Sequence, residues 1–256
     1  MFLMNFNKFL YIDSHCHIED KSFNKNRDEV IKRAFDGKVG IVTSGASLGG
    51  CKRALELKNQ YSIYATLGYH PGRVNAEEKA INEVYEFIRS NEKEILAVGE
   101  IGLDFNSGNI EKQEIIFKKF LELSKELNKP SVIHARGLEE KCFNISKNDS
   151  ILMYHCYGGS LELAKKLIDN GNYISISTII CFSNYHQKLV KNLNLENIVV
   201  ETDSPYLSPI KGEKNEPNNV VKVIEKIFEL KKDEYSLDEI TKIIYDNTKR
   251  LYRIQG

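Results

Sequence analysis

Six side chains that could bind a metal ion or move a proton follow short apolar runs of the sequence. They are His15, His17, Glu100, His134, His155 and Asp203. The first two are two residues apart, so in an extended segment both side chains point the same way and can reach one centre. Imidazole nitrogens and carboxylate oxygens without thiolates suit Zn²⁺, Mn²⁺, Fe²⁺ or Co²⁺ better than Ca²⁺, which takes oxygen ligands.

The number of these residues predicts more than one metal ion. A single catalytic ion needs three protein ligands and an open position. Two ions about 3.5–4 Å apart, bridged by a carboxylate and a water, use six ligands better. Glu100 is the candidate bridge, because a carboxylate on a middle strand can face both ions. We therefore predict two divalent metal ions, Mg²⁺, Mn²⁺ or Zn²⁺.

Three further residues have a different interpretation. His186 follows no apolar run and is interpreted as a surface residue. Cys16 and Cys156 are adjacent to predicted ligands, but in an extended chain they alternate to the opposite side. We therefore interpret both cysteines as small packing residues and not as thiolate ligands. A lone histidine at a strand end is more often structural, so the prediction depends on the whole set.

The elements that must position these residues alternate between short apolar runs and longer runs of helical period. Several apolar runs lack alternation, which is typical of strands buried on both faces of a parallel sheet. The predicted strands are residues 9–12, 39–43, 63–67, 95–99, 131–133, 151–154, 173–177 and 198–201. The predicted helices are residues 26–36, 109–128, 161–170, 220–231 and 237–252. Ser236 and Glu239 form the pattern of a capping box before the last helix.

Eight strands with helical or loop crossovers over about 250 residues predict a (β/α)8 TIM barrel, an α/β fold. No linker rich in Pro, Gly or Ser divides the chain, so we predict a single domain over residues 1–256. A doubly wound open sheet is the alternative architecture. In a barrel the carboxyl ends of the strands converge on one face, where the six predicted ligands would meet. Residues 137–150 look short for a full crossover helix.

The composition is that of a soluble globular protein and excludes disordered, collagen-like and coiled-coil chains. Of 256 residues, 28% are charged and 41% hydrophobic, and 36 basic residues balance 36 acidic ones. Since a broad nucleic-acid-binding face usually brings excess positive charge, any phosphate chemistry must be local to a site.

Several features favour a cytoplasmic protein. The five cysteines are odd in number and form no CxxC pattern, which favours reduced thiols. The N-terminal segment lacks the basic region of a signal peptide, and no run approaches the ~18 apolar residues of a membrane span. No heptad pattern is visible, so a monomer is the default prediction.

The motifs around the predicted ligands occur in an order that resembles the TatD family, metal-dependent deoxyribonucleases of the amidohydrolase superfamily. The matching stretches are residues 13–17 (DSHCH), 68–71 (GYHP), 99–104 (GEIGLD), 134–136 (HAR), 155–157 (HCY) and 201–207 (ETDSPYL). The resemblance implies a (β/α)8 barrel and the same six metal ligands. It places Glu100 where many members of the superfamily have a carboxylated lysine.

Two departures from the family pattern concern the substrate and not the ligands. Tyr157 is followed by two glycines, where the family usually has Ser or Thr and then Gly. Lys214 precedes an Asn-Glu-Pro run where an arginine is common, which replaces a bidentate fork with a point charge. Loops at this face of a barrel set specificity.

The reaction that the resemblance implies is hydrolysis of DNA phosphodiester bonds, of the 3′–5′ exonuclease type. A metal can lower the pKa of a bound water from 15.7 towards ~7. Asp203 would hold that water as ligand and general base, with Glu100 as the bridging carboxylate of the catalytic pair. We predict that His70, Arg136 and Lys214 orient the phosphate or the leaving group.

Single-stranded DNA ends are the predicted partner. Nucleases for single strands add aromatic stacking platforms. The motifs are flanked by Tyr69, Tyr157 and Tyr206, whose rings could stack on bases. Aromatic residues are, however, more often part of the hydrophobic core.

Two other functions are compatible with the same ligands. One is hydrolysis of a carboxylic ester, amide or lactone, for example deacylation of aminoacyl-tRNA or of a small metabolite. The activated water attacks a carbonyl as well as a phosphorus, so assays of acyl esters against phosphodiesters would separate the two. The other is a metal-binding scaffold without turnover. The presence of all six predicted ligands argues against this scaffold, because a protein without turnover has no need of Asp203 as a base.

Overall fold

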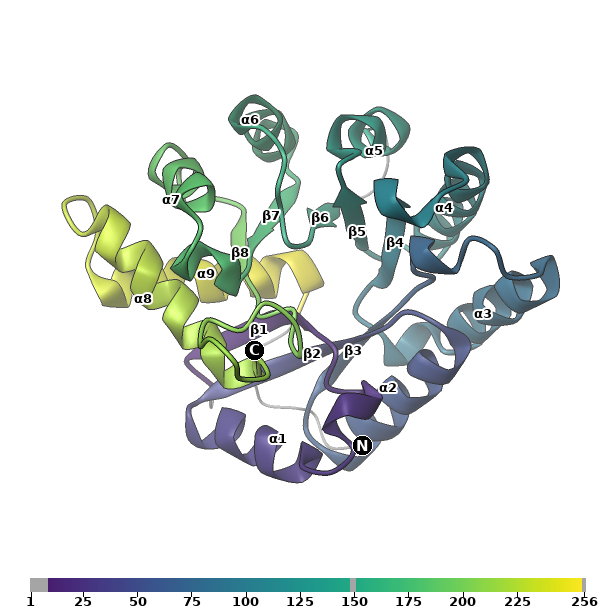
Figure 1. Ribbon diagram of the computed structural model, residues 1–256, viewed down its shortest axis with the longest axis horizontal. Helices are drawn as coiled ribbons and strands as arrows, with labels where there is room; N and C mark the ends of the chain where they lie inside the picture. The colour runs from purple at the N-terminus through teal and green to yellow at the C-terminus, as the bar shows by residue number, and fades with distance from the viewer. Residues whose placement is uncertain (1–8, 148–150, 255–256) are drawn as a thin grey trace.

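Eight parallel strands form one sheet in the computed structural model, which describes residues 9–147 and 151–254. The strands are β1 (Tyr11–Cys16), β2 (Val39–Gly45), β3 (Tyr64–Leu67), β4 (Val98–Asp104), β5 (Ser131–Arg136), β6 (Leu152–Tyr154), β7 (Tyr173–Ile176) and β8 (Ile198–Val200). Each pairs with the next along the chain, and helices surround them (Figure 1). The sequential order confirms the predicted barrel, since a doubly wound sheet would reverse its strand order.

The helices lie outside the strands. They are α1 (Arg27–Asp36), α2 (Leu48–Gln60), α3 (Glu78–Ser90), α4 (Ile110–Glu126), α5 (Glu139–Ser146), α6 (Leu161–Asp169), α7 (Asn184–Lys191), α8 (Val220–Lys231) and α9 (Leu237–Tyr252). The capping box of Ser236 and Glu239 is confirmed at the start of α9. The sequence prediction missed α2, α3, α5 and α7. The segment after β5 looked short for a full crossover helix, and α5 has eight residues.

Three strands extend further than predicted into the polar motifs. β1 continues to Cys16, β4 to Asp104 and β5 to Arg136, because their backbones stay paired with the neighbouring strands. His15, Glu100 and His134 therefore lie inside strands and not after them. Two predictions fall partly outside the described residues, the one on the N-terminal segment at residues 1–8 and the one on the crossover at residues 148–150.

The barrel is closed between β1 and β8 by a buried side chain and two backbone contacts. The carboxylate of Asp13, fully buried, accepts hydrogen bonds from the Thr202 amide at 2.8 Å and the Thr202 hydroxyl at 2.6 Å. The Asp203 amide donates to the His15 carbonyl at 3.1 Å, and the His17 amide to the Ser204 carbonyl at 2.7 Å. This seam brings ligand-type residues from the two ends of the chain together.

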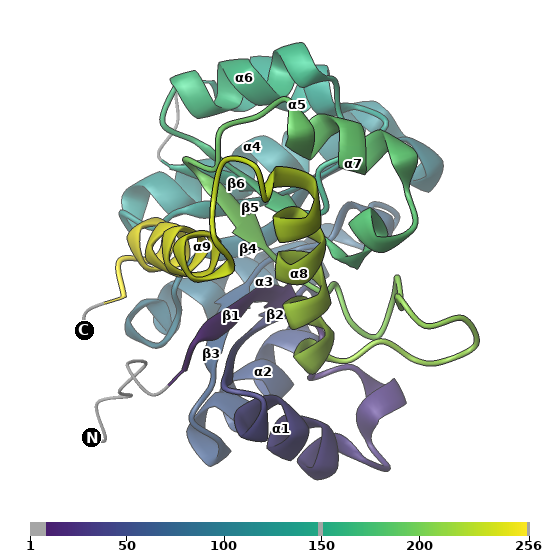
Figure 2. The same ribbon diagram turned by 90° about the vertical axis from the view of Figure 1, so that its left-hand side faces the viewer.

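The amino ends of the strands are filled with apolar side chains. This cluster, which we call the amino-end core, consists of Phe9, Ile12, Val42, Ala97, Val132, Met153, Tyr173, Val199, Leu251, Tyr252 and Ile254. In Figure 2 the start of β1 and the end of α9 lie at one end of the molecule, and the loop between β8 and α8 projects at the other. Layers of side chains fill a barrel of this size, so the space for a ligand lies at the carboxyl end.

The described helices include none long and apolar enough to span a membrane. All five cysteines are free thiols.

Candidate metal centre

The six predicted ligands converge at the carboxyl ends of the strands. Five of them line a cavity of about 1120 Å³, namely His17, Glu100, His134, His155 and Asp203. His15 is fully buried, with its Nε2 3.8 Å from Asp203 Oδ1. Strand positions account for this convergence, since β1, β4, β5, β6 and the loop after β8 each deliver ligand-type residues to the same end.

Glu100 lies at the middle of the cluster. Its Oε1 is 2.6 Å from His134 Nδ1 and 2.8 Å from His155 Nε2. Its Oε2 is 3.7 Å from His17 Nε2, which in turn lies 3.5 Å from Asp203 Oδ1. The two oxygens of this carboxylate therefore face ligand-type nitrogens on different strands.

Three overlapping groups of side chains could each hold a metal ion, with ligand atoms all within 4.8 Å of one another. The groups are His15, His17 and Glu100; His15, His155 and Asp203; and His70, Glu100 and His134. Glu100 belongs to two of the three, a position that suits a bridging carboxylate.

Acceptors behind the cluster fix the orientation of two imidazoles, and a third imidazole faces a carboxylate without a hydrogen bond to a described residue. The Nδ1 of His17 is 2.9 Å from the Ser44 carbonyl, so its Nε2 faces the centre. The Nε2 of His134 is 3.3 Å from Asp104, and its Nδ1 faces the centre. The Nδ1 of His155 is 3.4 Å from Glu201. Metal-binding histidines almost always donate their other N–H in this way.

Sequence reasoning quoted Asp104 and Glu201 within motifs but gave them no role. Both are buried, and the Glu201 carboxylate also accepts the Cys156 amide at 2.8 Å. The available signal was their even spacing from a predicted ligand, which in an extended chain places the two side chains on the same side. Asp104 ends the strand that carries Glu100, and Glu201 is two residues before Asp203.

His15 differs from these histidines. Neither ring nitrogen has a hydrogen-bond partner among the described residues, although the side chain is fully buried. Burial, together with neighbouring His155 and His17, lowers its pKa well below the usual value, so the ring is neutral. Buried polar atoms without partners are rare in proteins and call for an explanation such as an ion.

In this cluster, neighbouring groups of opposite charge outweigh the effect of burial on the pKa values of Glu100 and His17. Burial would raise the pKa of Glu100, but His155, His70 and His134 outweigh it and hold that pKa well below its usual value. Burial would lower the pKa of His17, but its carboxylate neighbours, above all Asp203, raise it. A hydrogen bond from His134 lowers the pKa of Asp104 to about 2. Glu100 and Asp104 are therefore ionised and available to cations.

His70, one of the predicted phosphate-orienting residues, lies beside the cluster. Its Nδ1 accepts a hydrogen bond from the Gly72 amide at 2.8 Å, so in the neutral ring the proton is on Nε2. Burial lowers the pKa of His70 to about 4, which keeps the ring neutral. The Nε2–H points towards Glu100 Oε1 at 3.6 Å. This tautomer makes His70 a hydrogen-bond donor in the cavity, although its position would also fit a ligand.

The structure separates the two predicted cations. Arg136 lines the cavity, with its guanidinium 3.7 Å from the Asp104 carboxylate. Lys214 is not among the residues that line the cavity. Its ammonium donates to the Ser22 carbonyl at 2.7 Å and lies 4.4 Å from the ring centroid of Phe23. Its contacts therefore tie the loop after β8 to the turn after β1.

The three tyrosines near the motifs have different surroundings. Tyr69 and Tyr157 are buried, and their hydroxyls donate to the carbonyls of Arg73 and Ser160. Tyr206 lines the cavity and is 57% exposed. Of the three, Tyr206 alone presents an open ring.

The interpretation of His186 as a surface residue is wrong. It is 9% exposed and lines the cavity, because α7, which the sequence prediction missed, turns its side chain inward. Cys16 is buried, with its thiol directed to the Val42 carbonyl. Cys156 lines the cavity instead of facing away, because its φ of 44° takes it out of the extended conformation that alternation requires.

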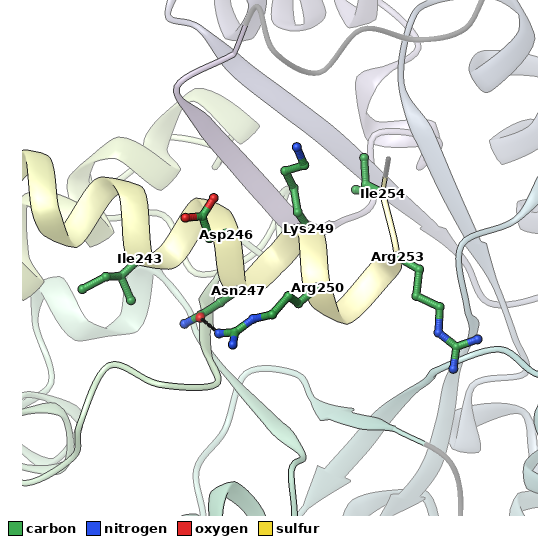
Figure 3. Close-up of a pocket in the computed structure, with 7 residues that line it drawn as sticks. All are labelled: Ile243, Asp246, Asn247, Lys249, Arg250, Arg253 and Ile254. Atoms are coloured by element: carbon green, nitrogen blue, oxygen red, sulfur yellow. Dashed lines mark hydrogen bonds between the residues drawn. The ribbon is translucent and has the colours of Figure 1, made fainter. Parts of the chain in front are cut away.

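A second cavity lies along α9 (Figure 3). It is lined by Ile243, Asp246, Asn247, Lys249, Arg250, Arg253 and Ile254. One carboxylate and no histidine are among these seven residues, so this surface offers no metal-binding set.

Comparisons with known proteins agree with the geometry. The model of the family described as TatD-related DNase matches residues 12–253. An uncharacterized metal-dependent hydrolase of Methanocaldococcus jannaschii is 59% identical over 243 residues, which cover 95% of this chain and 97% of that protein. Human deoxyribonuclease TATDN3 is 28% identical, with 94% of each chain covered.

A solved structure shows the same fold. The crystal structure of YjjV, a TatD homologue from Escherichia coli, has a TM-score of 0.88 and 25% identity to this chain. The match covers 96% of this chain and 99% of that one. The resemblance predicted from the motif series is confirmed.

Proposed function

We propose that this chain, which belongs to the TatD family of metal-dependent hydrolases, is a deoxyribonuclease that cleaves phosphodiester bonds from the 3′ end of DNA. The observation that carries the proposal is the cluster of six ligand-type side chains around Glu100, with a buried His15 whose ring nitrogens are unpaired. The family description and the name of the human relative TATDN3 support DNA as the substrate.

Two divalent ions, Mg²⁺, Mn²⁺ or Zn²⁺, fit these residues. His15, His17, His134, His155, Glu100 and Asp203 would hold them, with Glu100 between the two. When bound, such ions acidify a water and neutralise charge on phosphoryl oxygens. His15 supports this assignment, because an ion would satisfy a buried nitrogen that no described residue pairs.

The charge of the cavity also supports bound cations. Six carboxylates line it, from Glu19, Asp20, Glu100, Asp104, Glu139 and Asp203, against three arginines. This excess of negative charge would repel a phosphodiester. Divalent cations bound there would offset this charge, so they would favour substrate binding as well as supply the chemistry.

The chain's own residues would handle the protons and the orientation. Asp203, whose side chain is 15% exposed, is within reach of the cavity and would accept the proton of the attacking water. It would then return this proton to the leaving oxygen. The Nε2–H of His70 and the guanidinium of Arg136 would donate to the phosphate oxygens.

Release of nucleotides from 3′-labelled single-stranded DNA tests the proposal. We expect activity with Mg²⁺ or Mn²⁺ that EDTA abolishes, that added metal restores, and that the His134→Ala protein lacks. A 5′-labelled strand of the same sequence reports the direction of cleavage. Metal-replete protein that leaves both strands intact but hydrolyses acyl esters would overturn the proposal in favour of a deacylase. Metal binding with no turnover on either class would indicate a scaffold.

A further inference from the structure

We infer that one side of the cavity mouth holds the nucleotide next to the scissile phosphate, so that the preferred substrate is a polynucleotide strand and not a small diester. This inference rests on the proposed function. The residues are Arg73, Phe105 and Arg136, which we call the β3–β5 rim. The Arg73 guanidinium would bind the neighbouring phosphate, next to Arg136 at the scissile one, and the Phe105 ring would stack on the adjoining base.

The three residues come from adjacent turns. Arg73 ends the short turn after β3 (Pro71–Arg73), Phe105 begins the turn after β4 (Phe105–Ser107), and Arg136 ends β5. A Cβ at Gly72 would be 3.6 Å from the Ser107 hydroxyl oxygen, and one at Gly137 would be 3.4 Å from Phe105 Cβ. The three turns therefore form one continuous edge of the mouth, and both arginines line the cavity.

Phe105 is an open aromatic ring on a fixed backbone. It is 67% exposed, whereas Asp104 before it is buried against His134. The buried Gln113 side chain accepts the Asp104 amide at 2.8 Å and donates to the Asp104 carbonyl at 3.0 Å. A ring held out by such a rigid turn loses little conformational freedom when a base stacks on it.

The arginines supply positive charge where the rest of the cavity is acidic. Arg73 forms no ion pair with a described residue, while the Tyr69 hydroxyl fixes its backbone carbonyl at 3.0 Å. Arg136 is tethered to Asp104, which also accepts from His134. By contrast, Arg89 on α3 is paired with Glu126 at 3.5 Å. The rim arginines therefore retain donors for an anion.

The test compares two substrates, a short single-stranded oligodeoxynucleotide and bis(p-nitrophenyl) phosphate, a diester with no neighbouring phosphate. Arg73→Ala and Phe105→Ala are the variants. Arg89→Ala and Ile115→Ala are matched controls. Ile115 is 68% exposed, about as much as Phe105, but it lies on α4 and not on one of the three turns.

We expect each rim variant to lower the ratio of kcat/KM for the oligonucleotide to that for the small diester about tenfold, in line with base stacking. Arg73→Ala should also reduce the slope of log(kcat/KM) against log salt by about 0.7. The controls should change neither quantity. Equal losses on both substrates, or none on the oligonucleotide, would overturn the inference.

Binding separates this inference from the proposed function. Fluorescence anisotropy of a labelled oligonucleotide with metal-loaded Asp203→Asn protein needs no turnover. If wild-type protein hydrolyses neither diester but the rim variants still weaken binding about tenfold, the proposed function fails and the inference stands. If DNA is hydrolysed and the rim variants bind it as tightly as their parent, the inference fails and the function stands.

Discussion

The two ends of the barrel are built from opposite kinds of residue. The amino-end core is apolar and includes Ile12, Val132 and Met153, all with 2% exposure or less. Two or three residues further along the chain, His134 and His155 line the cavity and His15 is buried beside it. One end therefore provides stability, and the other provides ionisable groups whose burial is costly. Each strand contributes to both ends, so chemistry and folding can be changed almost independently.

Loss of the proposed general base is the sharpest test at the carboxyl end. Asp203→Asn keeps the size of the side chain but removes its capacity to accept a proton. We expect kcat to fall by about 10²–10⁴-fold, the range for a positioned acid–base group. Rates under metal saturation, with metal content measured in parallel, give the result. Near-full turnover with both ions bound would show that Asp203 is not the base.

Truncation at the amino end should give the reverse pattern. Met153 is fully buried in the amino-end core, so Met153→Ala removes apolar contacts and leaves a cavity. We expect a loss of about 2–5 kcal/mol in the free energy of unfolding. Urea denaturation measures this loss. The folded protein should keep its metal content and its kcat, and a loss of metal binding would show that the two ends are coupled.

A substitution at Glu201 tests whether the carboxylates behind the histidine ligands support metal binding. Glu201→Gln preserves the shape but weakens the acceptor that faces His155 Nδ1 at 3.4 Å. Loss of such a partner costs about 10–100-fold in metal affinity. Calorimetric titration of the metal-free protein checks this. A melting temperature that changes while metal affinity does not would assign Glu201 a purely structural role.

Chelation should affect stability as well as activity. Ions that bind the folded chain stabilise it by about 2.7 kcal/mol at a free concentration 100 times Kd. We expect EDTA to lower the melting temperature and added Mn²⁺ to restore it. The Met153→Ala protein should show the same metal-dependent shift, because its substitution lies at the other end. A shift absent in both proteins would contradict a bound metal.

Lys214 is expected to give the smallest effect. Its ammonium contacts Ser22 and the Phe23 ring and not the cavity. Surface contacts of this kind contribute about 0–1 kcal/mol. We expect Lys214→Ala to change kcat/KM on DNA less than twofold. A tenfold loss would restore Lys214 to the substrate-orienting role predicted from the sequence.

The parts that the sequence predicted well depend on local patterns. Apolar runs separated by helical segments define the barrel, and the position of His155 directly after a strand follows from them. Helix α3 also had a usable pattern, since Ile81, Val84 and Ile88 share its buried face.

The rest depends on three-dimensional context. The tautomer of His70 is set by a turn amide, and Asp104 and Glu201 become acceptors only when neighbouring strands align. His186 reaches the cavity through α7, and Phe105 follows Asp104, whose backbone is held by Gln113. None of these partners is adjacent in sequence, so periodicity carries no trace of them.

The seam at Asp13 makes completion of the site depend on the last strand of the barrel. His15 and His17 leave the ribosome early, but Asp203 joins them only after β8 has docked on β1 through Thr202. A partly synthesised or cleaved chain that ends before β8 would lack the proposed base while carrying every other candidate ligand. The complete set of candidate ligands therefore forms only after β8 has paired with β1.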